Sequence, residues 1–206
     1  PPRRPPPVAQ RLHELIRLFF DRILDTRTHH LRHFFDEQWN VRSDTYTFGH
    51  DIEAAWLLCE AAEVLGDPRL LSACRSLAVQ MAEEAFNEGL GADGALCYEG
   101  RDGQIVDFGH ECWPQAEAMV GFLNAHEISG NPKYLGAAMR VWHYIQQKLV
   151  DRVHGEWFWR INPDGKPDAT LPKVSEWKGP YHATRACLEV LHRLELMARP
   201  KSEAKK

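Results

Sequence analysis

Two histidines at the start of two predicted helices are the most informative residues of this sequence. His50 lies in the segment 49–53 (GHDIE) and His182 in the segment 177–182 (WKGPYH). In each segment, a Gly or Pro turn precedes the spacing of apolar residues that is typical of an amphipathic helix. Two imidazoles can share a proton-transfer reaction near neutral pH, because the unperturbed pKa of histidine is about 6.5. The pair therefore indicates acid–base chemistry.

A carboxylate accompanies the first histidine. Glu53 follows His50 by about one helical turn, so both side chains lie on the same face of the predicted helix. The carboxylate could orient the imidazole, raise its basicity or accept a hydrogen bond from a substrate hydroxyl. A structural ion pair, or a favourable charge at the helix start, is the alternative interpretation.

A second group of histidines invites a metal-site interpretation. His29, His30 and His33 lie close together in the chain, but no cysteine or carboxylate pattern of metal-binding spacing accompanies them. The spacing of His50 and Glu53 occurs in metal sites of helix bundles, but such a site needs a second pair of this kind. We therefore predict no metal site.

The elements that position these residues follow from the apolar spacing, and they are mainly helices. Asp-Gly turns and aromatic runs interrupt the helical pattern twice, over residues 92–107 and 155–174, and each stretch predicts a hairpin or ordered loop. The predicted helices span residues 8–24, 51–65, 68–86, 114–128, 132–150 and 180–198.

The chain also repeats itself. The segment from Glu53 through Gly66 to Leu71 matches a second one that begins at Glu117. A repeated unit of helix, tight turn, helix and long loop predicts an array of helical hairpins around a central cavity. In such an array the inner helices start at one mouth, which would place His50, Trp113 and His182 around one opening.

Composition limits the class of protein. The chain has 206 residues, 44% hydrophobic and 26% charged, which suits one soluble domain. The net charge of −4 leaves no basic footprint for nucleic acid. No apolar run approaches the ~20 residues of a membrane span.

Five widely spaced cysteines, an odd number, predict buried free thiols and a cytoplasmic protein. Residues 1–7 predict a disordered Pro-rich lead-in, 8–198 the domain, and 199–206 a charged tail.

Four segments of the chain are 48–58 (FGHDIEAAWLL), 113–122 (WPQAEAMVGF), 155–159 (GEWFW) and 177–189 (WKGPYHATRACLE). In this order and spacing they resemble the cellobiose 2-epimerase and N-acylglucosamine 2-epimerase superfamily. The resemblance covers the chain from about Leu12 to Leu194 and corresponds to the C-terminal half of such enzymes, which are about twice as long. Two positions depart from the family pattern: Gly179 stands where Cys is usual, and Ala183 stands where Asn is common.

The resemblance implies an all-α fold, the (α/α)6 barrel, of which this chain would form about half, with short β-hairpin loops. It implies a sugar 2-epimerase that acts at C2 of a reducing-end aldose, such as the glucose of a β-1,4 disaccharide, without a cofactor. His50 and His182 would be the two acid/bases on either side of a cis-enediolate, assisted by Glu53. The substrate-binding residues would be Trp113, Trp177, Glu117 and, more weakly, Trp39.

Three alternatives remain at this stage. An aldose–ketose isomerase of mannose type would use the same enediolate, whereas a truncated module would bind sugar without turnover. A glycoside hydrolase would need two carboxylates that flank the scissile bond, and histidines are the dominant pair here. The small-molecule partner would be a sugar in each case, and the open face of a half-barrel predicts self-association.

Overall fold

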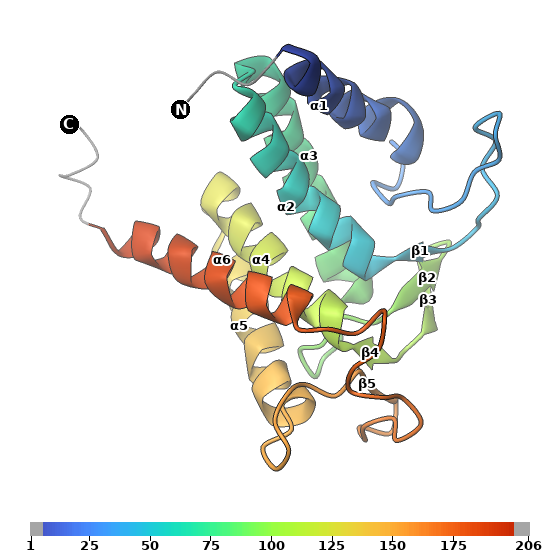
Figure 1. The fold of residues 1–206 in the computed structure, drawn as a ribbon, viewed down its shortest axis with the longest axis vertical. Helices are drawn as coiled ribbons and strands as arrows, with labels where there is room; N and C mark the ends of the chain where they lie inside the picture. The colour runs from blue at the N-terminus through green and yellow to red at the C-terminus, as the bar shows by residue number, and fades with distance from the viewer. Residues whose placement is uncertain (1–5, 200–206) are drawn as a thin grey trace.

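The computed structural model describes residues 6–199, which form a layered array of helices (Figure 1). Helices α2, α4 and α6 lie next to one another as an inner layer, and α3 and α5 pack against its outer side. Helix α1 packs against α2 at one end of the array. The α-helices are α1 (Pro6–Leu18), α2 (Phe48–Leu65), α3 (Pro68–Glu84), α4 (Cys112–Ser129), α5 (Pro132–Tyr144) and α6 (Tyr181–Ala198).

The predicted repeat is visible in the turns between the helices. Helix α2 ends at Gly66, whose φ of 77° is a left-handed conformation that favours glycine. Asp67 then caps α3 by accepting hydrogen bonds from two backbone amides. Gly130, with φ of 69°, and Asn131 repeat this stop and start between α4 and α5. The same local rule therefore builds both helical hairpins.

A second repeat was not predicted from the sequence. Three helices, α1, α3 and α5, each continue into one π-helical turn, and each turn leads into a β-bridge that closes a short loop. These turns are η1 (Phe19–Ile23), η2 (Ala85–Gly89) and η3 (Ile145–Leu149). The sequence predicted helices that extend to residues 24, 86 and 150. They extend beyond the α-helices because the apolar residues of a π turn keep nearly helical spacing.

Short strands join the loops at one end of the array. Strands β1 (Tyr46–Thr47), β2 (Glu99–Arg101) and β3 (Gln104–Asp107) form an antiparallel sheet in the order β1-β2-β3. Strands β4 (His110–Glu111) and β5 (Arg160–Ile161) form a second antiparallel pair. Figure 1 shows both groups at the end where α2 and α4 begin.

The strands differ in part from the prediction. The hairpin within 92–107 is confirmed, with its turn at Asp102-Gly103, but its first strand begins after the segment 95–98. Residues 95–97 instead pack into the core. In the second loop, Arg160–Ile161 forms the strand rather than residues 157–159. Ile161 bridges Pro167 across the turn at residues 162–165 of the same loop, and the strand also pairs with the distant β4. Long-range pairing of this kind leaves no local sequence signal.

Two of the inner helices, α2 and α4, are buried on nearly all sides. Phe48 and Ile52 of α2 and Phe122 of α4 are fully buried. The inner position explains why α2 lacks the amphipathic pattern expected for a surface helix. Gly121 permits the close approach of α2 and α4, since a Cβ there would lie 2.7 Å from the Ile52 carbonyl oxygen. The core thus fixes the inner layer, whose first turns carry the candidate residues.

Several boundaries and side chains differ from the prediction. Helix α1 begins at Pro6, so the last two residues of the predicted lead-in are helical, whereas residues 1–5 and 200–206 lie outside the described part. The cysteines are free, and four are buried as predicted. Cys187 is exposed because it lies on the outward flank of α6. Within residues 6–199, no helix has the length and apolar character needed to cross a membrane.

Candidate functional site

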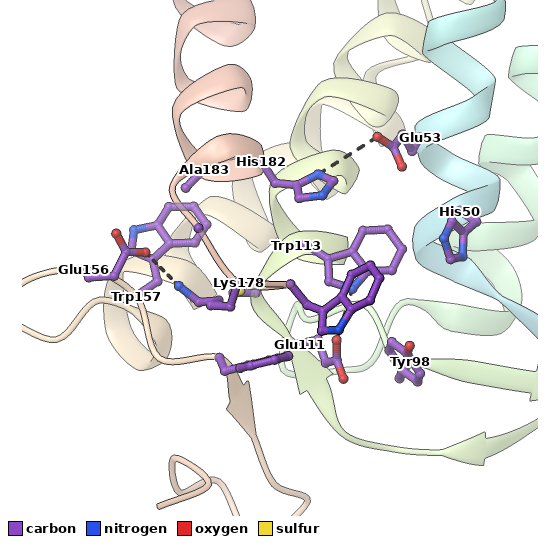
Figure 2. Close-up of a pocket in the computed structure, with 14 residues that line it drawn as sticks. His50, Glu53, Tyr98, Glu111, Trp113, Glu156, Trp157, Lys178, His182 and Ala183 are labelled. Atoms are coloured by element: carbon purple, nitrogen blue, oxygen red, sulfur yellow. Dashed lines mark hydrogen bonds and ion pairs between the residues drawn. The ribbon is translucent and has the colours of Figure 1, made fainter. Parts of the chain in front are cut away.

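A cavity of about 410 Å³ lies where α2, α4 and α6 begin, which is where the repeat placed one opening. Five of the predicted site residues line it, and they come from three helices and the loop before α6 (Figure 2). They are His50, Glu53, Trp113, Trp177 and His182.

Trp113 lies next to both histidines. Its ring centroid is 4.7 Å from that of His50 and 5.5 Å from that of His182. Gly49 permits the contact between α2 and α4, because a Cβ at Gly49 would lie 2.5 Å from the Trp113 ring. The two imidazoles therefore face one cavity with an indole beside both. Trp113 itself is fixed by its Nε1–H, which donates to Glu111 Oε2 at 3.1 Å.

A buried carboxylate holds His182. Glu117 is fully buried on α4, and its Oε1 lies 2.6 Å from His182 Nδ1. A carboxylate only accepts hydrogen bonds, so His182 Nδ1 carries the proton of this bond. Trp56 Nε1 donates to the other Glu117 oxygen at 3.0 Å. The arrangement fixes the ring orientation of His182 and leaves its Nε2 to face the cavity.

A neutral hydroxyl holds His50. His50 is the third residue of α2, and its Nδ1 lies 2.5 Å from Oγ1 of Thr47, the residue that precedes the helix. Thr47 makes no side-chain cap to a helix amide, because its hydroxyl is engaged by His50 instead. Partial burial lowers the pKa of His50, the carboxylates of Glu53 and Asp51 oppose this, and His182 adds to it. A hydroxyl can donate or accept, so it suits an imidazole that changes protonation state.

Arg185 bridges the carboxylates of Glu53 and Glu117. Its guanidinium hydrogen-bonds to Glu53 and lies 2.6 Å from Glu117 Oε1. Burial opposes its charge, but Glu117 and Glu53 raise the pKa of Arg185 above the usual value. Glu53, Glu117 and His182 also offer ligand atoms within 4.8 Å of one another. Because Arg185 is bound to both carboxylates, the group forms a complete ion network rather than an open set of metal ligands.

The loop before α6 carries Trp177 to the rim of the cavity. The Trp177 side chain is 84% exposed, whereas the next residue, Lys178, is buried. Lys178 Nζ donates to Glu156 Oε1 at 2.9 Å, and Glu156 adopts a φ of 63°, which is uncommon outside glycine. This ion pair ties the loop of Trp177 to the turn at residues 155–157, and both segments line the cavity.

Two of the predicted substrate-binding residues lie elsewhere. Glu117 sits behind His182 and does not line the cavity. Trp39 lies on the long loop between η1 and β1, where its ring packs at 5.3 Å from that of Phe35. Trp39 is not among the residues that line the cavity.

The family model for N-acylglucosamine 2-epimerase matches residues 6–186 of this chain. The chain belongs to the N-acylglucosamine 2-epimerase family. A curated relative, cellobiose 2-epimerase of Bacteroides fragilis, is 41% identical over 186 residues, which cover 89% of this chain and 47% of that protein. The chain therefore spans about half the length of the curated relatives it matches.

Solved structures agree with the family assignment. A sugar epimerase from a ruminal bacterium superposes with a TM-score of 0.87 at 36% identity, covering 91% of this chain and 48% of that one. A D-mannose isomerase superposes with a TM-score of 0.78 at 17% identity over 91% of this chain and 51% of that one, which shows the shared fold. The prediction of about half an (α/α)6 barrel with short hairpin loops is confirmed.

Several residues that line the cavity were not predicted from the sequence as site residues. Trp157 and Trp159 belong to the predicted hairpin or ordered loop of residues 155–174, and both line the cavity. Glu111 lines it as well, and burial raises the pKa of its carboxyl despite the hydrogen bond from Trp113. Burial also raises the pKa of Tyr98 to about 12. They lie in or just before short strands rather than in a helix pattern, so the apolar spacing did not mark them.

Proposed function

We propose that this pocket binds the reducing-end aldose of a β-1,4-linked disaccharide such as cellobiose and epimerises it at C2. The observation that carries the proposal is that His50 and His182 line one cavity, each with its Nδ1 engaged by a protein group. The identity to a cellobiose 2-epimerase supports the choice of substrate class. One base on each side of the substrate is what inversion at C2 requires.

The chemistry begins with the open-chain aldehyde. A neutral imidazole removes the C2 proton, the electron pair of that bond forms a C1–C2 double bond, and the aldehyde oxygen becomes an enediolate oxygen. The opposite imidazolium then returns a proton to C2 from the other face, and the C1 carbonyl re-forms. His50 and His182 exchange the roles of base and acid when the reaction runs in reverse.

The other residues support this exchange. Glu117 orients His182 and Thr47 orients His50, so that the Nε2 atoms are the ones left for substrate. Glu53 lines the cavity and holds Arg185, which leaves its remaining oxygen for a hydroxyl. Trp113 and Trp177 offer indole faces on which the apolar C–H surface of a sugar ring packs.

The test is to incubate the protein with cellobiose in deuterated water and to identify the products by NMR. Epimerisation yields the mannose-ended disaccharide with deuterium at C2. A ketose with deuterium at C1 instead identifies an aldose–ketose isomerase, the alternative with the same enediolate. Binding without turnover identifies a sugar-binding module. Mannose and N-acetylglucosamine in parallel define the substrate class.

The role of the second histidine has its own test. We expect His182→Ala to abolish epimerisation with an unchanged circular dichroism spectrum. His192→Ala, at an exposed position further along α6, is the matched control and keeps wild-type turnover. Wild-type turnover in His182→Ala would reject the role.

A further inference from the structure

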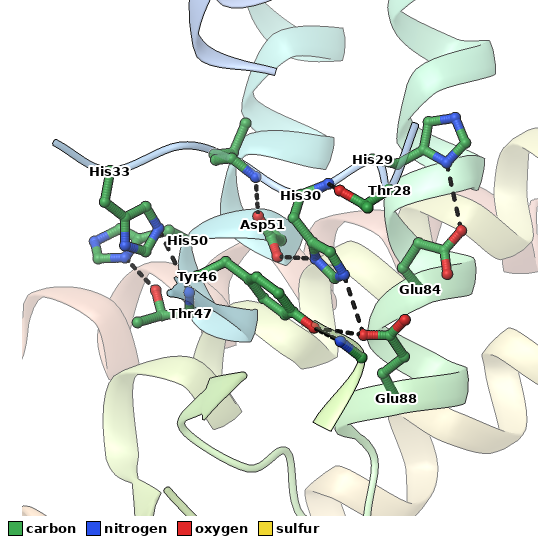
Figure 3. Close-up of polar contacts among 12 residues, drawn as sticks. Thr28, His29, His30, His33, Tyr46, Thr47, His50, Asp51, Glu84 and Glu88 are labelled. Atoms are coloured by element: carbon green, nitrogen blue, oxygen red, sulfur yellow. Dashed lines mark hydrogen bonds and ion pairs between the residues drawn. The ribbon is translucent and has the colours of Figure 1, made fainter. Parts of the chain in front are cut away.

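His33 is a half-buried histidine that the proposed chemistry does not use. It lies on the loop between η1 and β1, and its ring meets that of His50 edge to face at a centroid distance of 5.0 Å and an angle of 75° (Figure 3). Both histidines also form hydrogen bonds with Thr47. The backbone amide of Thr47 donates to His33 Nε2 at 3.5 Å, and its hydroxyl holds His50 Nδ1.

Hydrogen bonds to Asp51, the residue after His50, hold the loop that carries His33. Asp51 is buried, and one of its oxygens lies 2.7 Å from His30 Nδ1 while the other accepts the Leu31 amide at 2.8 Å. His30 also binds Glu88 through Nε2 at 3.1 Å, and its ring stacks on Tyr46 at 3.6 Å. A histidine that donates from both nitrogens to carboxylates is an imidazolium.

The pKa of His30 agrees with the positive charge that its two hydrogen bonds imply. Burial opposes the charge of His30, but Asp51 and Glu88 outweigh it and raise the pKa of His30. The His33 amide donates to Ser43 Oγ at 3.2 Å, which fixes the loop from its other side. The position of His33 relative to His50 is therefore set by contacts on both sides of the loop rather than by the ring pair alone.

We propose that His33 is a positioning residue, which holds Thr47 and the His50 ring so that His50 Nε2 faces the cavity as an uncharged base. The titratable groups that face His50 are His33 from the loop, His182 from α6 and the carboxylates of Asp51 and Glu53 from α2. Burial and the nearby His50 lower the pKa of His33 to about 4. His33 thus stays neutral and acts as an acceptor for the Thr47 amide.

The inference rests on the proposed function for its purpose, but its first test needs no substrate. The tautomer and pKa of His50 are measured by NMR on histidine-labelled protein, with the signal assigned from a His50→Gln spectrum. Replacing His33 by Phe keeps a ring but removes the acceptor and the second imidazole. We expect the tautomer ratio of His50 to change in His33→Phe, because the Thr47 amide loses its acceptor and the Thr47 hydroxyl holds His50 Nδ1.

Two further variants complete the design. His33→Gln returns an acceptor near the position of Nε2, so it restores the wild-type tautomer ratio of His50. His143→Phe, at an exposed position on α5, is the control and leaves His50 unchanged. If epimerisation is present, its kcat falls in His33→Phe and returns toward the wild-type value in His33→Gln.

The outcomes separate the two proposals. An unchanged His50 tautomer ratio in folded His33→Phe overturns the positioning role, whatever the turnover. A changed tautomer ratio in His33→Phe, together with a wild-type chain that turns over no sugar, supports the positioning role and rejects the epimerase function. If His33→Phe does not fold, a His50 tautomer in His33→Gln that matches wild type supports the acceptor role, and an altered one overturns it.

Discussion

Glu117 Oε1 lies 2.6 Å from His182 Nδ1, so a fully buried carboxylate on α4 fixes a histidine on α6 that faces the cavity. The same oxygen lies 2.6 Å from Arg185. The contact connects two inner helices and couples the stability of the array to the orientation of a candidate acid/base. It also shows why Glu117 acts behind the cavity and not on its surface.

The first prediction concerns this contact. Glu117→Gln keeps the shape of the side chain but removes the charge that compensates Arg185 and orients His182. We expect the free energy of unfolding to fall by about 3 kcal/mol, as for a broken buried ion pair. Epimerisation should fall by about 10²-fold or more, because a mis-oriented acid/base loses most of its contribution.

Chemical denaturation and the deuterium assay measure the two effects separately. Glu176→Gln, in the exposed loop before α6, is the control for loss of one negative charge. Full activity in Glu117→Gln would contradict the assigned orientation of His182.

The second prediction concerns acid stability. The pKa of His33 is about 4 in the folded chain, below the unfolded value of about 6.5. The unfolded state therefore binds a proton first as the pH falls, so the contribution of His33 to stability is lost between about pH 6.5 and pH 4. We expect this loss to be about 2 kcal/mol for His33. Urea denaturation at pH 7 and pH 4.5 measures it.

His33→Gln removes this titration, so its stability should fall less than that of wild type over the same interval. Equal losses in the two proteins would show that His33 is protonated in the folded state above pH 4.5. The comparison also removes the contributions of other titrating groups, which both proteins share.

The third prediction concerns packing between the inner helices. Gly121 faces Ile52, and a Cβ there would lie 2.7 Å from a backbone oxygen that cannot move aside. We expect Gly121→Ala to cost about 2 kcal/mol or more through overpacking. Gly136 on α5 has open space around it, so Gly136→Ala should stabilise the chain by up to about 1 kcal/mol through helix propensity. Thermal denaturation of both variants checks the contrast.

The fourth prediction concerns the two ends of the half-barrel. An apolar groove of about 340 Å³ lies between α1 and α2, and another of about 400 Å³ lies on α4, α5 and α6. The grooves leave apolar side chains uncovered, so we propose that two copies of the chain associate through them. Light scattering should then show a concentration-dependent dimer.

Leu191 is 58% exposed in the second groove, so Leu191→Glu should raise the dissociation constant by about tenfold or more. Val153 is 83% exposed and lines neither groove, so Val153→Glu is the control for added charge. A wild-type chain that stays monomeric at high concentration would contradict the proposal.

The sequence by itself determined the helices, their repeat and the end at which the candidate residues meet. These features are local, because the Gly66 and Gly130 turns, the caps that follow them and the apolar spacing each depend on neighbouring residues. The family segments in register added the half-barrel, which the comparisons confirm.

Only the tertiary structure decided which groups hold the two histidines. Glu117 contacts His182 from another helix, and His33 reaches His50 from a loop whose anchor is the buried pair of His30 and Asp51. Such contacts join residues that are distant in the chain or lie in irregular backbone, so no periodicity marks them. The electrostatic surroundings of an imidazole depend on these distances, and hydrogen bonds and burial set them only once the chain has folded.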